Sequence, residues 1–160
     1  MGRLESYLKA EGIWHRFIDK EETVHTKDAS QVTGIELRRI TKNLACRTSD
    51  GECVLLIIPG DRRVDLKAAA DALRVKNVSL LSPRESESVT GYPPGGTPSI
   101  GHDSKMRAVL DRRLLGFETV FCGGGRRDKL LELRTKDVLE KSGAVVADIC
   151  SETGPSSGLS

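Results

Sequence analysis

The sequence contains few of the residues on which metal sites depend. It has three histidines and four cysteines among 160 residues. The cysteines, Cys46, Cys53, Cys122 and Cys150, form no Cys-x-x-Cys pair and have no histidine at metal-ligand spacing, so we expect no metal site. All four lie in or beside apolar segments, which predicts reduced, packed thiols in a reducing compartment. A nucleophilic cysteine is the alternative, although few histidines exist to activate one.

Long apolar runs are also missing. The longest covers residues 54–58, too few to cross a bilayer, and the opening MGRLESYLKAEG lacks the apolar stretch of a secretory signal. We therefore expect a cytoplasmic protein with no membrane partner. Aromatic residues make up 4%, hydrophobic residues 38% and charged residues 30%, as in a globular domain. The net charge of +2 is nearly balanced, so attraction to nucleic acid would need a local patch.

The length and the local patterns predict one domain over residues 1–150 and a polar tail over 151–160. Helices are expected at residues 3–12, about 28–34, 65–74, from 82 onward and 135–142. Strands are expected at residues 14–22, 40–48, 52–59, 78–81, 117–122 and 144–149. Asp50-Gly51 is typical of a hairpin turn, which excludes an all-parallel sheet. The fold class is therefore α/β (α+β), with a mixed sheet in a single compact domain.

One lysine is expected to point into the core. In the strand predicted at residues 40–48, Lys42 shares a face with Ile40, Leu44 and Cys46. An isolated buried ammonium is costly, so such a lysine needs a partner, a lowered pKa or a ligand. The alternatives are that Lys42 extends to the sheet edge or that the true register differs by one residue.

A second feature is the stretch GYPPGGTPSIGH at residues 91–102. It holds four of the sixteen glycines and three of the six prolines. Glycine lets a backbone approach a ligand closely, and proline holds that backbone in one shape. This density predicts a rigid, amide-lined wall of a binding site. An ordinary long surface connection is the alternative.

With these features the chain resembles the YbaK/ProX family of aminoacyl-tRNA deacylases, which is similar to the editing domain inserted in bacterial prolyl-tRNA synthetases. The resemblance covers about residues 2–150. It rests on Thr41-Lys42-Asn43-Leu44, on VDLKAAADAL, on Thr90-Gly91-Tyr92 with the glycines up to Gly101, and on FETVFCGGGRR. It implies a barrel-like mixed β-sheet flanked by helices. It also implies hydrolysis of mischarged aminoacyl-tRNA of the Cys-tRNA(Pro) or Ala-tRNA(Pro) type, with no cofactor.

The resemblance also implies roles for individual residues. Lys42 would contact the acceptor end of the tRNA, and Gly96 and Gly101 would position the aminoacyl group and stabilise negative charge on its carbonyl oxygen. The substrate's own ribose hydroxyl and an ordered water would carry out the chemistry. The aminoacyl pocket would be lined by Tyr92, Gly95, Thr97, Pro98, Ser99, His102, His25 and Thr26. Arg126 and Arg127 would contact the tRNA, and prolyl-tRNA synthetase is a further expected partner.

The sequence departs from the family at several positions. Ser99 stands where the related motif has proline, which leaves the choice between cysteinyl and alanyl esters open. Asp128 and Leu130 follow the glycine turn where family members often have glycine and a polar residue, so no catalytic acid is assigned there.

Interpretations in which some of these residues have no role in a site also stay open. His25 could simply cap a helix, His102 could be a solvated turn residue, and Arg126 and Arg127 could lie in solvent. Two other functions remain possible at this point. One is a non-catalytic module that binds the tRNA acceptor end or a synthetase, and the other is an unrelated small-molecule enzyme.

Overall fold

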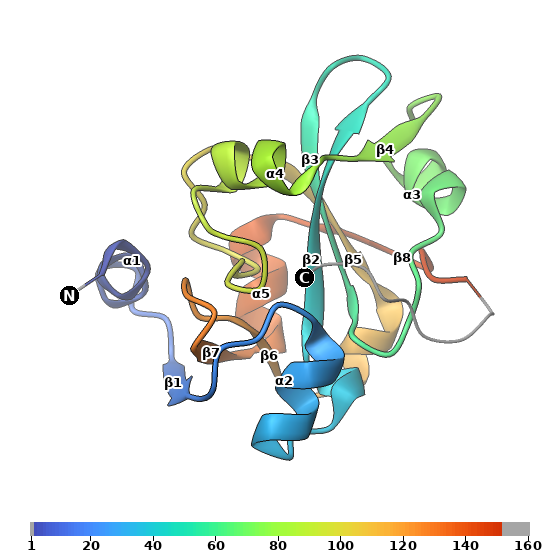
Figure 1. Ribbon diagram of the computed structural model, residues 1–160. Helices are drawn as coiled ribbons and strands as arrows, with labels where there is room; N and C mark the ends of the chain where they lie inside the picture. Colours follow the sequence, from blue (N-terminus) through green and yellow to red (C-terminus); the bar gives the residue numbers. More distant parts are fainter. Residues whose placement is uncertain (1, 152–160) are drawn as a thin grey trace.

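The structure, a computed structural model, describes residues 2–151 (Figure 1). The tail predicted at residues 151–160 therefore lies, apart from Ser151, outside the described residues. The helices are α1 (Arg3–Ala10), α2 (Thr26–Thr33), α3 (Leu66–Leu73), α4 (Pro83–Thr90) and α5 (Thr135–Ser142), with short 3-10 turns η1 (Leu37–Arg39) and η2 (Arg112–Gly116). The strands are β1 (His15–Asp19), β2 (Thr41–Thr48), β3 (Cys53–Pro59), β4 (Val78–Leu80), β5 (Arg107–Asp111), β6 (Thr119–Gly123), β7 (Lys129–Arg134) and β8 (Val145–Ala147).

Local sequence signals account for most element boundaries. Gly51 adopts φ +87° in the turn between β2 and β3, which confirms the predicted hairpin. Helix α4 begins with a capping box in which Ser82 and Glu85 satisfy each other's backbone N–H groups, and Pro83 occupies the first helical position. Helix α2 ends at Gly34 in the left-handed conformation, as expected, but begins two residues before Asp28.

The strands form two sheets. One has three strands in the order β1-β7-β6, and the other has five in the order β4-β2-β3-β5-β8. β3 pairs with β5 and β5 with β8 in parallel, while the remaining pairs are antiparallel, so the prediction of a mixed α/β domain is confirmed. An isolated bridge between Ile40 and Phe121 links the two sheets. Over residues 2–151 they do not close into a barrel, and the barrel-like part of the expectation is not confirmed.

The central strand β3 is buried on both faces, as its apolar run predicts. Leu56 and Ile58 pack toward α3, where Ala69 and Leu73 cover them. The opposite face, with Leu55 and Ile57, packs against the three-stranded sheet, α1 and α5. The domain therefore has two apolar layers, and β2 lies beside β3 with one of its faces toward each.

The cysteines fit the expected packing role only in part. Cys46 and Cys122 are buried, whereas Cys53 and Cys150 are half-buried, and all four are free thiols. Burial raises the pKa of Cys122 to about 11, so this thiol stays protonated at neutral pH. Within residues 2–151 no helix is both long and apolar enough to span a membrane.

Candidate active site

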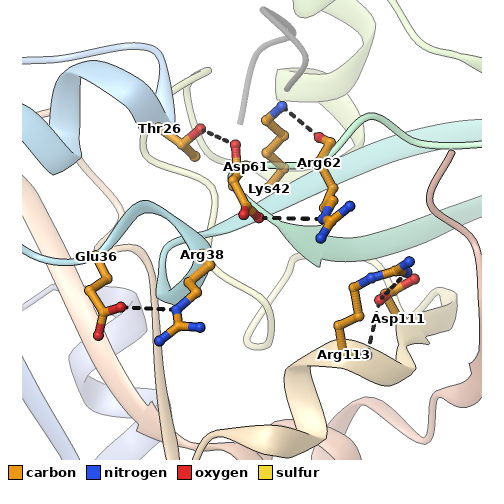
Figure 2. A network of polar contacts seen from close by, with 9 residues as sticks. Thr26, Glu36, Arg38, Lys42, Asp61, Arg62, Asp111 and Arg113 are labelled. Atoms are coloured by element: carbon orange, nitrogen blue, oxygen red, sulfur yellow. Dashed lines mark hydrogen bonds and ion pairs between the residues drawn. The ribbon is translucent and has the colours of Figure 1, made fainter. Parts of the chain in front are cut away.

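Lys42 points into the protein from the start of β2. The residue is 1% exposed, and its Nζ donates a 2.9 Å hydrogen bond to the carbonyl oxygen of Arg62 (Figure 2). Lys42 pairs with Ile58 in the sheet, and Cys46 on the same face of β2 is fully buried. The prediction of an inward lysine is confirmed, and the alternatives of an edge position or a shifted register are wrong.

Burial changes the acid–base behaviour of this lysine. The pKa of Lys42 is lowered from 10.5 to about 8, chiefly by desolvation. The positive charge of Arg63 also contributes to this lowering, whereas Cys150 and Asp61 oppose it. The ammonium therefore remains mostly protonated at pH 7 and loses its charge within a mildly alkaline range. A charged donor that is only 1% exposed is suited to binding an oxygen-rich ligand.

Thr26 approaches the same backbone segment from α2. Its Oγ1 donates a 3.3 Å hydrogen bond to the carbonyl oxygen of Gly60, two residues before Arg62 (Figure 2). Gly60 cannot be larger, since a Cβ there would lie 2.4 Å from the carbonyl oxygen of Ile40. The β3–α3 connection thus accepts hydrogen bonds from both Lys42 and Thr26 and holds them at one end of the five-stranded sheet.

His25 occupies the N-cap position of α2, but its side chain makes no capping hydrogen bond. The alternative that this histidine serves as a helix cap is therefore wrong. Its place beside Thr26 puts it at the same end of the domain as Lys42.

The Gly-Pro loop, residues 91–102, is packed against the protein on several sides. A Cβ at Gly95 would lie 2.7 Å from Val24, one at Gly96 would lie 2.9 Å from Arg126, and one at Gly101 would lie 2.9 Å from Leu4. These glycines therefore allow the loop to approach other parts of the chain, which the sequence did not predict. Residues 96–100 are buried, so the loop is not an ordinary surface connection.

A buried polar cluster fastens this loop to β2. Ser99 Oγ donates a 2.6 Å hydrogen bond to Asn43 Oδ1, and Asn43 Nδ2 donates to the carbonyl oxygen of Thr97 at 3.3 Å. Asn43 Nδ2 also donates to Thr41 Oγ1 at 3.0 Å, and Thr41 Oγ1 donates to the carbonyl oxygen of Phe121 at 3.2 Å. Because buried polar groups are costly when unpaired, this cluster fixes the loop in one position. Ser99 and Thr97 therefore contact β2.

Tyr92 and His102 brace the loop from within. The hydroxyl of Tyr92 donates a 2.6 Å hydrogen bond to the carbonyl oxygen of Gly101, and Nε2 of His102 lies 2.7 Å from the carbonyl oxygen of Pro98. The two rings meet edge-on, with centroids 6.2 Å apart. Burial lowers the pKa of His102, which keeps the imidazole neutral as the donor to Pro98. The interpretation of His102 as a solvated turn residue is wrong.

Arg126 and Arg127 lie in the turn between β6 and β7 and behave differently. Arg127 Nε donates a 2.8 Å hydrogen bond to the carbonyl oxygen of Pro94, so it supports the loop. Arg126 is exposed, pairs with Asp128 through two 3.1 Å hydrogen bonds, and lines a groove of about 590 Å³. Arg126 thus presents its guanidinium to solvent beside this groove, whereas Arg127 is tied to the loop.

The predicted site residues therefore fall into two groups, one on each face of β2. Lys42 and Thr26 gather at the β3–α3 connection, while Tyr92, Thr97, Ser99 and His102 belong to the braced loop on the face of Asn43. Sequence reasoning missed Asn43 and Thr41 as loop anchors. Their signal was present as two polar residues that flank Lys42 at the start of the strand.

Comparison with known proteins identifies the family to which the chain belongs. Residues 20–141 match the model of the aminoacyl-tRNA editing domain. The chain belongs to this family. The editing domain described here is 31% identical to YwhH of Bacillus subtilis over 144 residues, which cover 87% of this chain and 91% of that protein. It is 29% identical to the multifunctional Ser/Thr-tRNA deacylase ProXp-y of Escherichia coli K12, covering 86% of this chain and 84% of ProXp-y.

A solved structure extends the likeness to the fold of the editing domain. A proposed trans-editing enzyme for prolyl-tRNA synthetase superposes with a TM-score of 0.83 at 30% identity, covering 93% of this chain and 95% of the other. The resemblance to the YbaK/ProX family predicted from the sequence is therefore confirmed.

Proposed function

We propose that this editing domain is a trans-editing hydrolase that removes a wrongly attached amino acid from tRNA, of the Cys-tRNA(Pro) or Ala-tRNA(Pro) type. The observation that supports this most directly is the buried, hydrogen-bonded Lys42 at the start of β2 in a chain of the editing family. No resident cofactor takes part in the proposed reaction. Prolyl-tRNA synthetase is the proposed source of the mischarged tRNA.

Lys42 is proposed to bind oxygen atoms of the terminal nucleotide. Its ammonium is held on the carbonyl oxygen of Arg62, so it is already oriented before a substrate arrives. A phosphate or ribose oxygen would gain a charge-assisted hydrogen bond from it at pH values below about 8, where the lysine is protonated. His25 and Thr26, at the start of α2, are proposed to contact the substrate at the same end of the sheet.

The Gly-Pro loop is proposed to form the wall of the aminoacyl pocket. Gly95 and Gly101 are proposed to contribute backbone groups to it, whereas Gly96 already donates its N–H to the carbonyl oxygen of Pro93 at 2.9 Å. Asn43 holds the loop through Thr97 and Ser99. A fixed backbone donor stabilises charge that develops on the ester carbonyl oxygen. Such a wall discriminates amino acids chiefly by size, and Thr97, Pro98 and Ser99 are the proposed determinants of that size.

The proposed reaction is ester hydrolysis. An ordered water adds to the acyl carbon, the bond between that carbon and the ribose oxygen breaks, and the neighbouring ribose hydroxyl assists. The products are the free amino acid and an uncharged tRNA. The proposal assigns no nucleophilic side chain to the protein, since the thiol of Cys122 is buried with a raised pKa. Arg126 and Arg127 are proposed to contact the tRNA beside the loop.

The test is release of labelled amino acid from Cys-tRNA(Pro) and Ala-tRNA(Pro), with Ser- and Thr-charged tRNA and correctly charged Pro-tRNA(Pro) alongside. Lys42→Ala should lower kcat/KM by about 100-fold, the loss typical of removing one charged contact in a catalytic site. Lys67→Ala, which removes an exposed lysine from α3, is the matched control and should act like wild type. Folded wild-type protein that accelerates none of these hydrolyses contradicts the proposal. If it binds charged tRNA and protects the ester, it is a binding module instead.

A further inference from the structure

Three Arg-Arg pairs lie at the end of the five-stranded sheet that holds Lys42. One pair precedes β2, one follows β3 and one follows β5, namely Arg38 with Arg39, Arg62 with Arg63, and Arg112 with Arg113. β2 is antiparallel to β3, and β3 is parallel to β5. The start of β2 and the ends of β3 and β5 therefore lie at the same end of the sheet. The topology thus brings six of the chain's arginines to the end of the sheet at which Lys42 lies.

Electrostatic effects place these arginines near the candidate site. The charge of Arg63 lowers the pKa of Lys42, and the charges of Arg113 and Arg62 lower the pKa of the Cys150 thiol. Figure 2 shows Arg38, Arg62 and Arg113 around the strand ends from which Lys42 extends. Arg62, Arg63 and Arg113 therefore lie close enough to Lys42 or Cys150 to change their pKa values, and Asp61 and Asp111 lie among them.

Two of the six arginines are committed to the protein itself. Arg39 donates to Thr119 at 2.7 Å and stacks on the ring of Phe121, and Arg113 neutralises the fully buried Asp111 at 3.6 Å. The remaining four, Arg38, Arg62, Arg63 and Arg112, we call the arginine rim.

The arginine rim is available to an incoming anion. Arg63 is exposed and has no acidic partner among residues 2–151. Arg62 lies 4.0 Å from the carboxylate of its neighbour Asp61. Arg112 pairs with Asp148 at 3.2 Å, where both side chains are more than half exposed. Arg38 pairs with Glu36, only two residues away, and also lies 5.4 Å over the ring of Phe117, so it is the least available of the four. Such surface ion pairs contribute little, so an anion with several charges can displace them.

We infer that the arginine rim binds the phosphodiester backbone of the tRNA acceptor stem while the aminoacyl end lies beside Lys42. This inference rests on the proposed function and adds to it the surface that receives the RNA. Guanidinium groups match phosphate geometry and keep their charge at every physiological pH. The whole chain has a net charge of only +2, so attraction to RNA depends on a local cluster such as this one.

The experiment compares two double variants that remove the same charge. Arg63→Gln/Arg112→Gln changes the rim, and Arg47→Gln/Arg84→Gln removes two exposed arginines from the opposite end of β2 and from α4. Binding of uncharged tRNA(Pro) is measured by fluorescence anisotropy across a salt series. Hydrolysis is measured on mischarged tRNA and on the same amino acid esterified to adenosine, which has no stem.

The rim variant should bind uncharged tRNA about tenfold more weakly, and its slope of log Kd against log salt should fall by about two. Its kcat/KM should fall several times more for mischarged tRNA than for the adenosine ester, whereas the control variant should follow wild type. Equal Kd values and salt slopes for the rim variant and wild type, or an equal loss in the control variant, overturn the inference. Failure of wild type to hydrolyse either ester refutes the proposed function alone, since tRNA binding still decides the role of the rim.

Discussion

The Oγ atom of Ser99 donates a 2.6 Å hydrogen bond to Oδ1 of Asn43, across 56 residues of sequence. Both residues are almost fully buried, at 1% and 2% exposure. The bond therefore joins β2 to the Gly-Pro loop in an environment where water cannot replace either partner. Its strength determines how firmly the loop is held.

Replacing Ser99 with alanine should destabilise the protein by about 1–3 kcal/mol, because Asn43 Oδ1 would remain buried without its donor. Urea unfolding at pH 7 measures this change. In a double-mutant cycle with Asn43→Ala, the two losses should be clearly less than additive. Additive losses would show that the two side chains do not act as a pair.

Stability should depend on pH through Lys42. The pKa of Lys42 is about 8 in the folded protein and near 10.5 when unfolded, so between these values the unfolded chain binds more protons. The cost of burying the charge is present below pH 8 and is relieved as the pH rises toward 10.5. The unfolding free energy of wild type, relative to Lys42→Met, should therefore increase by about 2 kcal/mol between pH 7 and 10. Parallel profiles of the two proteins would contradict this.

Gly123 should tolerate no side chain. A Cβ there would lie 2.4 Å from the carbonyl carbon of Gly96 and 2.5 Å from the backbone nitrogen of Thr97. Gly123→Ala should therefore cost more than about 2 kcal/mol and push the loop away from β6. Gly116→Ala is the matched control, because a Cβ at Gly116 would meet nothing within 4 Å. Similar thermal midpoints for the two variants would show that the loop adjusts freely.

His102 should weaken the fold in mild acid. Burial lowers its pKa below 6.5, so as the pH falls below that value the unfolded chain takes up a proton that the folded protein does not. His102→Gln keeps a donor for the Pro98 carbonyl but does not titrate. The stability advantage of wild type over this variant should therefore shrink between pH 7 and 5, as followed by urea midpoints. A constant difference over this range would mean that His102 does not respond as described.

Local patterns in the sequence correctly predicted the direction in which Lys42 points. The period-two pattern of residues 40–48 correctly predicted that Lys42 lies on the face of Cys46. It could not show that the opposite face is buried as well, because residues 97–100 cover that face from more than 50 positions away. Polar residues such as Thr41 and Asn43 look the same in a sequence whether they meet water or a partner in the core.

The Gly-Pro loop illustrates the same limit. Its composition predicted close approach of the backbone to a ligand, whereas the folded chain shows these glycines against Val24, Arg126 and Leu4. The number of sheets was likewise beyond local patterns, because pairing of β1 with β7 joins residues more than 100 positions apart. The role of the site residues in catalysis remains a prediction that the experiments above test.

Successive side chains of β2 point to opposite faces of the sheet, and this separates two parts of the candidate site. Lys42 is held on the carbonyl of Arg62 on one face, and Asn43, its immediate neighbour, holds the loop on the other. Substitutions around Ser99 can therefore change the shape of the loop without changing the hydrogen bond that orients Lys42. Under the proposed function, a lineage of these proteins could therefore exchange one amino-acid preference for another without changing how Lys42 is held.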